Sequence, residues 1–129
     1  MKNSLLEKSK KYRKLSDELL DSSGLIPVLE KFGEIHFVGS YAAELQMSGD
    51  IDIHILRDKP FTKNEALVIF NEIVKNTKFN SYYMGDWNGT NLHLEFPEGY
   101  YIGLKIKLDG EKWKIDIWLL SKDEQERLN

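Results

Sequence analysis

The sequence predicts an α+β fold in a single domain. Apolar residues recur at helical spacing in the first part of the chain and again over residues 62–74. From residue 79 onward the pattern changes to strand-like runs that are separated by turn residues such as Asn-Gly and Asp-Gly. We therefore expect helices early in the chain to pack against a β-sheet whose strands come largely from its second half.

Length and composition limit the class of protein. The chain has 129 residues, enough for one buried core, and its 41% hydrophobic and 30% charged residues are typical of a soluble folded domain. A net charge of −3 argues against a surface built entirely to bind nucleic acid, although a local basic patch is compatible with it. The absence of cysteine excludes a disulfide framework and a thiolate nucleophile. Charged residues interrupt any signal peptide or membrane span, so we expect a cytoplasmic protein with no membrane partner.

Each element of the first half follows from local patterns. Residues 4–20 form an amphipathic pattern, with leucines on one stripe and lysines mainly elsewhere, so the lysines are expected to be a solvated face. A second short helix over residues 25–32 accepts Pro27 in its first turn and is closed by Gly33. The next expected elements are a strand over 34–38, a helical turn over 40–45 and a strand over 51–56.

The most clearly marked helix begins after Thr62. Thr62 and Glu65 form a capping-box motif, and Phe61 can contact Ala66 as a hydrophobic staple. Strands are expected over residues 79–85, 92–96, 100–108 and 112–119, with turns at Asn88-Gly89 and Asp109-Gly110. One domain over residues 1–129 is expected, with helices over 1–33, the sheet and its helix over 34–119, and the start of a C-terminal helix over 120–129.

Asp50 and Asp52 are the first candidate site residues. Side chains two positions apart on a strand project from the same face, so these carboxylates lie side by side while Ile51 and Ile53 face the core. Two neighbouring anions raise each other's pKa unless a cation lies between them. Mg²⁺, a hard ion that binds carboxylate and phosphate oxygens, is the natural candidate.

Gly39 and Ser40 are candidates for binding an anion such as phosphate. They lie where a strand ends and a helical turn is expected to begin, so free backbone N–H groups are available there. Gly39 lets the backbone approach a ligand closely, and the Ser40 hydroxyl can cap the turn or donate to a phosphate oxygen.

The last hairpin contributes a third carboxylate. A two-residue turn at Asp109-Gly110 sets the register, which places three pairs of residues opposite each other: Leu108 and Glu111, Lys105 and Lys114, and Gly103 and Asp116. Asp116 lies between Ile115 and Ile117, which repeats the pattern around Asp52. Lys105 and Lys114 could neutralise phosphates or be ordinary exposed lysines, and Tyr101 and Trp118 could stack on a ring or simply pack. His54 continues the face of Asp50 and Asp52 and is expected to be packed or hydrogen-bonded.

These motifs resemble the nucleotidyltransferase superfamily typified by DNA polymerase beta and by bacterial antibiotic nucleotidyltransferases. The shared features are Gly-Ser at residues 39–40, Asp-x-Asp at residues 50–52 and a distant third acid at Asp116 between apolar residues. The resemblance covers residues 35–119 and implies the nucleotidyltransferase fold, a mixed, mostly antiparallel β-sheet with helices packed on one face.

The resemblance also implies a reaction and a set of residue roles. Gly39 and Ser40 would hold the phosphates of a nucleoside triphosphate. Asp50, Asp52 and Asp116 would be the catalytic residues and would hold two Mg²⁺ ions, with Asp116 also a candidate to take the proton of the acceptor hydroxyl. A nucleoside monophosphate would then move to a hydroxyl group of a small molecule such as an antibiotic, or of a protein, and pyrophosphate would leave.

Two other functions stay open on the sequence. Minimal members of this superfamily act as antitoxins that adenylylate a partner protein, and a non-catalytic nucleotide-binding module would keep the same acids. The chain stops soon after Asp116, where many relatives carry a helical region that builds the acceptor pocket. A protein partner, a second copy of the chain or a further C-terminal segment is therefore expected to complete the site.

Overall fold

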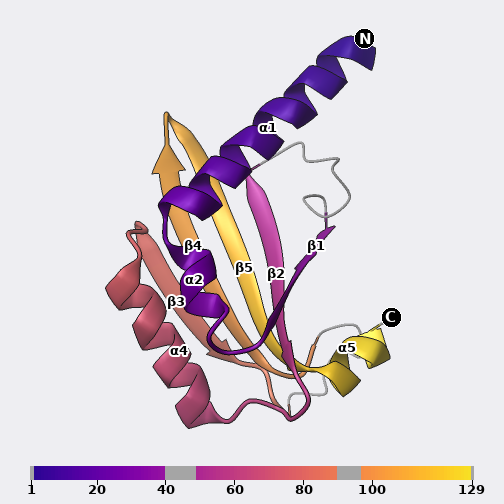
Figure 1. The fold of residues 1–129 in the computed structure, drawn as a ribbon, viewed down its shortest axis with the longest axis vertical. Coiled ribbons are helices and arrows are strands. Elements are labelled where there is room, and N and C mark those ends of the chain that lie inside the picture. Colours follow the sequence, from indigo (N-terminus) through magenta and orange to yellow (C-terminus); the bar gives the residue numbers. More distant parts are fainter. Residues whose placement is uncertain (1, 40–48, 90–96, 129) are drawn as a thin grey trace.

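A computed structural model describes residues 2–39, 49–89 and 97–128 of the chain, and Figure 1 shows how their helices and strands are arranged. The elements are α1 (Lys2–Ser22), α2 (Leu25–Leu29), β1 (Glu34–Val38), β2 (Asp50–Arg57), α4 (Lys63–Asn76), β3 (Ser81–Asp86), β4 (Tyr100–Leu108), β5 (Glu111–Ser121) and α5 (Lys122–Leu128). The expected helical turn over 40–45, which includes Ser40, and the expected strand over 92–96 fall outside the described residues.

The five described strands form one mixed sheet in the order β1-β2-β5-β4-β3. Three neighbouring pairs are antiparallel, and the central pair, β2 and β5, is parallel. This arrangement confirms the predicted α+β class and the mostly antiparallel sheet. The predicted hairpin register is also confirmed: Asp109 and Gly110 both have positive φ, as a two-residue turn between twisted strands requires, and Lys105 pairs with Lys114.

Helices α1, α2 and α4 lie on one face of the sheet (Figure 1), as predicted. The apolar side chains of the strands alternate toward these helices and are fully buried, while the intervening polar residues face the other way. The core joins three groups of side chains: Ile51, Ile53, Ile55, Ile102, Leu104, Ile115 and Ile117 from the strands, Leu19, Leu25 and Leu29 from the first two helices, and Ile69 and Ile73 from α4. The opposite face therefore carries the polar side chains of the central strands.

Several element boundaries differ from the predictions by a few residues; β3, for example, begins at Ser81 rather than at residue 79. The second helix ends at Leu29 rather than at residue 32, because the next backbone N–H groups, of Lys31 and Phe32, bond carbonyls only three residues back. Helix α1 is longer than predicted. It is amphipathic, and within the described ranges no helix is both long and apolar enough to cross a membrane.

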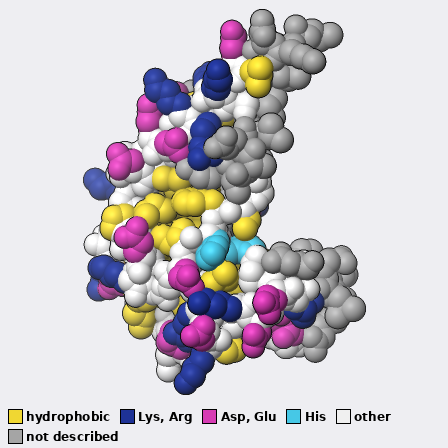
Figure 2. All heavy atoms as spheres, turned by 45° about the vertical axis from the view of Figure 1, so that its right-hand side comes forward, with side chains coloured by type: hydrophobic (Ala, Val, Ile, Leu, Met, Phe, Trp, Pro, Cys, Tyr) yellow, Lys and Arg dark blue, Asp and Glu magenta, His cyan; other side chains and the backbone are white. Residues whose placement is uncertain are grey.

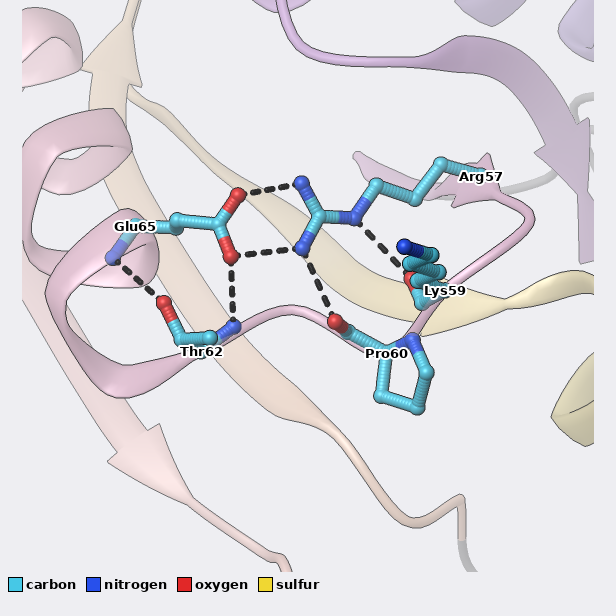
Figure 3. Close-up of polar contacts among 5 residues, drawn as sticks. All are labelled: Arg57, Lys59, Pro60, Thr62 and Glu65. Atoms are coloured by element: carbon cyan, nitrogen blue, oxygen red, sulfur yellow. Dashed lines mark hydrogen bonds and ion pairs between the residues drawn. The ribbon is translucent and has the colours of Figure 1, made fainter.

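The start of α4 is held by a small polar network (Figure 3). Thr62 and Glu65 form the predicted capping box in both directions, at 3.2 Å and 3.0 Å. Arg57, at the end of β2, donates to both carboxylate oxygens of Glu65 and covers the Phe61 ring at 4.1 Å from its centroid. This ion pair links the end of β2 to the first turn of α4, which the capping motif alone does not reveal.

Candidate active site

Two of the predicted acids, Asp52 and Asp116, lie directly beside each other. They are register partners on β2 and β5, the two parallel strands at the centre of the sheet. Each is half-buried, and each is flanked along its strand by fully buried isoleucines that anchor it from the core side. The apolar residues on one face of the sheet thus hold a pair of carboxylates on the other.

Burial and neighbouring charge act together on this pair. Burial raises the pKa of Asp52 above its usual range, and the carboxylates of Asp116 and Asp50 raise it further. The Lys114 ammonium lowers it by a smaller amount. Asp52 is therefore a carboxyl group whose charged form needs a cation or a shared proton to be stable.

Asp116 is held by donors on both oxygens. The Tyr101 hydroxyl donates to Oδ1 of Asp116, and the Lys114 Nζ lies 3.5 Å from Oδ2. Gly103, opposite Asp116 in β4, makes the first contact possible, since a Cβ there would lie 2.6 Å from the Tyr101 hydroxyl oxygen. Burial and the Asp116 carboxylate raise the pKa of Tyr101, so this hydroxyl stays protonated and donates.

Gly39 brings the end of β1 against Asp52. Its φ of 72° lies in the left-handed region that favours glycine, and a Cβ at this position would lie 2.7 Å from Oδ2 of Asp52. The backbone that was predicted to cradle a phosphate is therefore next to the carboxylate pair. Ser40, the other half of this motif, lies outside the described residues.

The remaining predicted residues lie one row further along the sheet. Asp50 is the register partner of Lys114, and Lys114 is the partner of Lys105 across the hairpin. All three line a common cavity of about 440 Å³. The structure thus gathers Gly39, Asp50, Asp52, Asp116 and both lysines on neighbouring positions of one sheet face.

The donor set fits a hard divalent cation at the carboxylate pair. Asp52 and Asp116 offer oxygens from adjacent strands. The pKa of Asp52 is raised by burial and by repulsion from Asp116 and Asp50, and a bound cation would offset both effects. In residues 2–39, 49–89 and 97–128, no three or more His, Asp or Glu side chains are grouped as a ready set of metal ligands. The pair would accordingly need water or phosphate oxygens to complete a coordination shell, as Mg²⁺ commonly does.

Sequence reasoning missed one contact in this site and foresaw another. The sequence indicates stacking or packing for Tyr101, yet its hydroxyl also donates to Asp116, a contact that the predicted pairing of Gly103 with Asp116 could have suggested. Its ring also packs against Trp118, with centroids 5.2 Å apart, and against Tyr83 at 5.8 Å. His54 is hydrogen-bonded as predicted: its Nδ1 lies 2.5 Å from Oε1 of Gln125 in α5, and burial lowers its pKa.

The sequence matches no protein-family model and no curated protein. The function is therefore argued from the geometry and chemistry of these residues.

Proposed function

We propose that this protein is a Mg²⁺-dependent nucleotidyltransferase of the DNA polymerase beta-like superfamily. It would move a nucleoside monophosphate from a nucleoside triphosphate to a hydroxyl group of an acceptor, either a small molecule or a protein, in the cytoplasm. The observation that carries the proposal is the carboxylate pair of Asp52 and Asp116, in register on adjacent parallel strands, with the Gly39 backbone against Asp52. Neighbouring acids beside a glycine at a strand end suit the binding of a metal-complexed phosphate.

The chemistry needs little covalent participation from the protein. The acceptor oxygen forms a bond to the α-phosphorus, the bond between this phosphorus and the oxygen bridging to the β-phosphorus breaks, and pyrophosphate leaves. Bound Mg²⁺ would neutralise the charge that develops on the phosphate oxygens. Catalysis would come mainly from positioning and electrostatic stabilisation.

Each site residue has a distinct task in this reaction. Asp50, Asp52 and Asp116 would hold two Mg²⁺ ions, and Gly39 and Ser40 would bind phosphate oxygens. Asp116 would also take the proton of the acceptor hydroxyl. Tyr101 and Lys114 would keep Asp116 oriented through contacts with its two oxygens.

A transfer assay tests the proposal. The protein is incubated with each of the four common α-labelled nucleoside triphosphates, Mg²⁺ and candidate acceptors, including aminoglycosides and co-purifying proteins, and pyrophosphate release is followed. We expect Asp52→Asn and Asp116→Asn each to lower turnover by about 100-fold or more, since each removes charge that stabilises the transition state. Asp58→Asn is the matched control, because Asp58 is 89% exposed and pairs with Lys122, outside the site.

The outcomes separate the proposal from its alternatives. Label on a co-purifying protein would identify a protein acceptor, as in antitoxin-like relatives, and label on an added small molecule would identify the other acceptor class. Mg²⁺-dependent binding of a triphosphate without pyrophosphate release from any acceptor would show a non-catalytic nucleotide-binding module instead. Turnover that is unchanged in both Asn variants would contradict the assigned site.

A further inference from the structure

Four lysines gather at one end of the sheet face that carries Asp116. Two successive cross-strand pairs place Lys105 opposite Lys114 and Lys107 opposite Lys112. Together with Asp50 and Asn80 they line the cavity of about 440 Å³, which we call the lysine cavity. We propose that the lysine cavity binds a polyphosphate chain, and that in the reaction proposed above this chain is the β- and γ-phosphates of the nucleoside triphosphate.

The lysine pairs are unfavourable for the fold by themselves. Like charges directly opposite each other on antiparallel strands destabilise a sheet. Lysines often protect the open edge of a sheet, but Lys105 and Lys114 lie on interior strands, where Ser81 of β3 pairs with Lys105 and Asp50 of β2 pairs with Lys114. A bound anion gives these residues a role that edge protection does not.

Acidic side chains neutralise the positive charge of the four lysines only in part. Lys114 forms an ion pair with Asp116 at 3.5 Å, whereas Lys105, Lys107 and Lys112 form no ion pair with any residue that the structure describes. On the side of the molecule seen in Figure 2, by contrast, basic and acidic side chains are mixed, and on α1 Arg13 pairs with Asp17. Three of the four lysines of the cavity thus have no acidic partner among the described residues.

The lining also includes Ile106, Trp113 and a neutral donor, Asn80. Asn80 precedes β3, and its Oδ1 accepts a hydrogen bond of 2.7 Å from the backbone N–H of Lys107. With its oxygen engaged in this way, the side-chain NH₂ group of Asn80 is an additional donor in the lining of the cavity. Several ammonium groups beside an amide donor suit a chain of phosphates, whose many oxygens accept hydrogen bonds.

The location suits a leaving group. Lys112, Lys114 and Asp116 follow one another on the same face of β5, so the lysine cavity adjoins the carboxylate pair. If the α-phosphorus lies at Asp52 and Asp116, then the Gly39 backbone, which lies against Asp52, would contact the α-phosphate. The β- and γ-phosphates would extend over Lys114 and Lys105 toward Lys112 and Lys107. This last step, the orientation of the substrate, rests on the proposed function, whereas affinity for a polyphosphate does not.

Calorimetric titration with inorganic triphosphate, pyrophosphate and orthophosphate, without divalent cation, tests the site directly. We expect affinity to increase with chain length and to fall as salt is added. The double variants Lys105→Gln/Lys114→Gln and Lys107→Gln/Lys112→Gln should each weaken triphosphate binding by about tenfold or more. The matched control Lys10→Gln/Lys14→Gln removes the same charge from α1 and should change affinity by less than about twofold.

A thermal melt separates binding from folding. Because these hairpin substitutions relieve repulsion between paired lysines, Lys107→Gln/Lys112→Gln should melt at or above the temperature of the wild type. Lys105→Gln/Lys114→Gln also loses the contact of Lys114 with Asp116, so for this variant a single cooperative transition shows that the fold is retained. Triphosphate binding that is equal in the wild type, the hairpin variants and the α1 control would overturn the proposal. Orthophosphate binding as tight as triphosphate binding would overturn it as well.

A third set of titrations distinguishes polyphosphate from nucleic acid and separates this proposal from the proposed function. Tighter binding of a single-stranded oligonucleotide, lost in the same lysine variants, would replace polyphosphate by nucleic acid as the ligand. Asp52→Asn should still bind inorganic triphosphate although it transfers no nucleotide. If the wild type binds inorganic triphosphate through these lysines but transfers no nucleotide, the proposed function is contradicted and the lysine cavity is supported as a site. If the lysine variants transfer nucleotide with unchanged KM for the triphosphate, only the lysine cavity is contradicted.

Discussion

Gly39 and Asp52 approach each other so closely that no larger residue fits between them: a Cβ at position 39 would lie 2.7 Å from Oδ2 of Asp52. We expect Gly39→Ala to displace the Asp52 carboxylate and to weaken both Mg²⁺ and triphosphate binding by about tenfold or more, in addition to a backbone cost of about 1–2 kcal/mol for alanine at positive φ. Titration with Mg²⁺ and with a non-hydrolysable triphosphate measures the first effect, and chemical unfolding measures the second.

Gly89→Ala is the matched control for this substitution. Gly89 has nearly the same φ, 71° against 72°, but a Cβ there meets no atom of the described residues within 4 Å. It should show the backbone cost without the loss of binding. Equal ligand binding by the two variants would show that the contact between Gly39 and Asp52 does not shape the site.

Asp52→Asn should stabilise the folded protein at neutral pH while it abolishes transfer. The pKa of Asp52 is raised in the folded state, so its ionised form opposes folding. The neutral asparagine should raise the free energy of unfolding by about 0.5–1 kcal/mol, a modest value because the group is only half-buried. The gain should vanish below about pH 4, where the carboxyl group is protonated in both states, and should grow as the pH rises through the raised pKa. Urea unfolding between pH 3 and 8, with a chelator present, measures it.

Divalent cation should make the wild type more stable than Asp52→Asn. Added Mg²⁺ should raise the melting temperature of the wild type, because it binds the folded state, and should have little effect on Asp52→Asn. Asp58→Asn serves as the control and should respond to Mg²⁺ as the wild type does. A wild type that gains no stability from Mg²⁺ at millimolar concentration would contradict a metal site at the carboxylate pair.

Tyr101→Phe tests whether orientation of Asp116 matters to the chemistry. The substitution keeps the ring and its contact with Trp118 but removes the hydroxyl that donates to Asp116. We expect kcat to fall by about tenfold with little change in KM for the triphosphate. The free energy of unfolding should fall by about 1 kcal/mol. Steady-state kinetics and urea unfolding check these values.

Tyr83→Phe is the control for Tyr101→Phe, because its ring packs on Tyr101 and it lies on the same sheet face. It should leave kcat unchanged. A loss of kcat of similar size in both variants would indicate a general disturbance of the aromatic side chains and not a specific role of the Tyr101 hydroxyl.

Glu65→Gln should make the free energy of unfolding less dependent on pH between about pH 4 and pH 2. Glutamine can keep the capping box with Thr62, but it removes the charge that faces Arg57. Arg57 and the Thr62 donors lower the pKa of Glu65 to about 2, so its ionised form stabilises the fold above about pH 4, and this contribution is lost as the pH falls toward 2. Wild type and variant should therefore converge in urea unfolding over this range, and Glu72→Gln, on the same helix, is the control.

Much of the candidate site followed from periodicity and turn chemistry. Alternation placed Asp50 and Asp52 on one face, and the Asp109-Gly110 turn set the register that puts Gly103 opposite Asp116. These patterns are local, since each depends on side chains a few positions apart or on one tight hairpin. They also account for the capping of α4 by Thr62 and Glu65.

Other features depend on pairings between distant segments. No local pattern indicates that β2 lies parallel to β5, yet this pairing brings Asp52 beside Asp116. The Asp116 carboxylate then adds to the effect of burial, which raises the pKa of Asp52 most. The ion pair of Arg57 with Glu65 and the contact of Tyr101 with Asp116 likewise join elements whose approach is decided by core packing.

The sequence by itself determined the α+β class, most element positions, the hairpin register and the identity of the acidic residues, because hydrophobic periodicity and turn residues act over short distances. Only the tertiary structure decided which acids meet, which donors hold them and where the four lysines line a common cavity. The physical reason is that burial of the isoleucines on the helix-covered face selects one order of strands, and that order places the charged residues together on the opposite face.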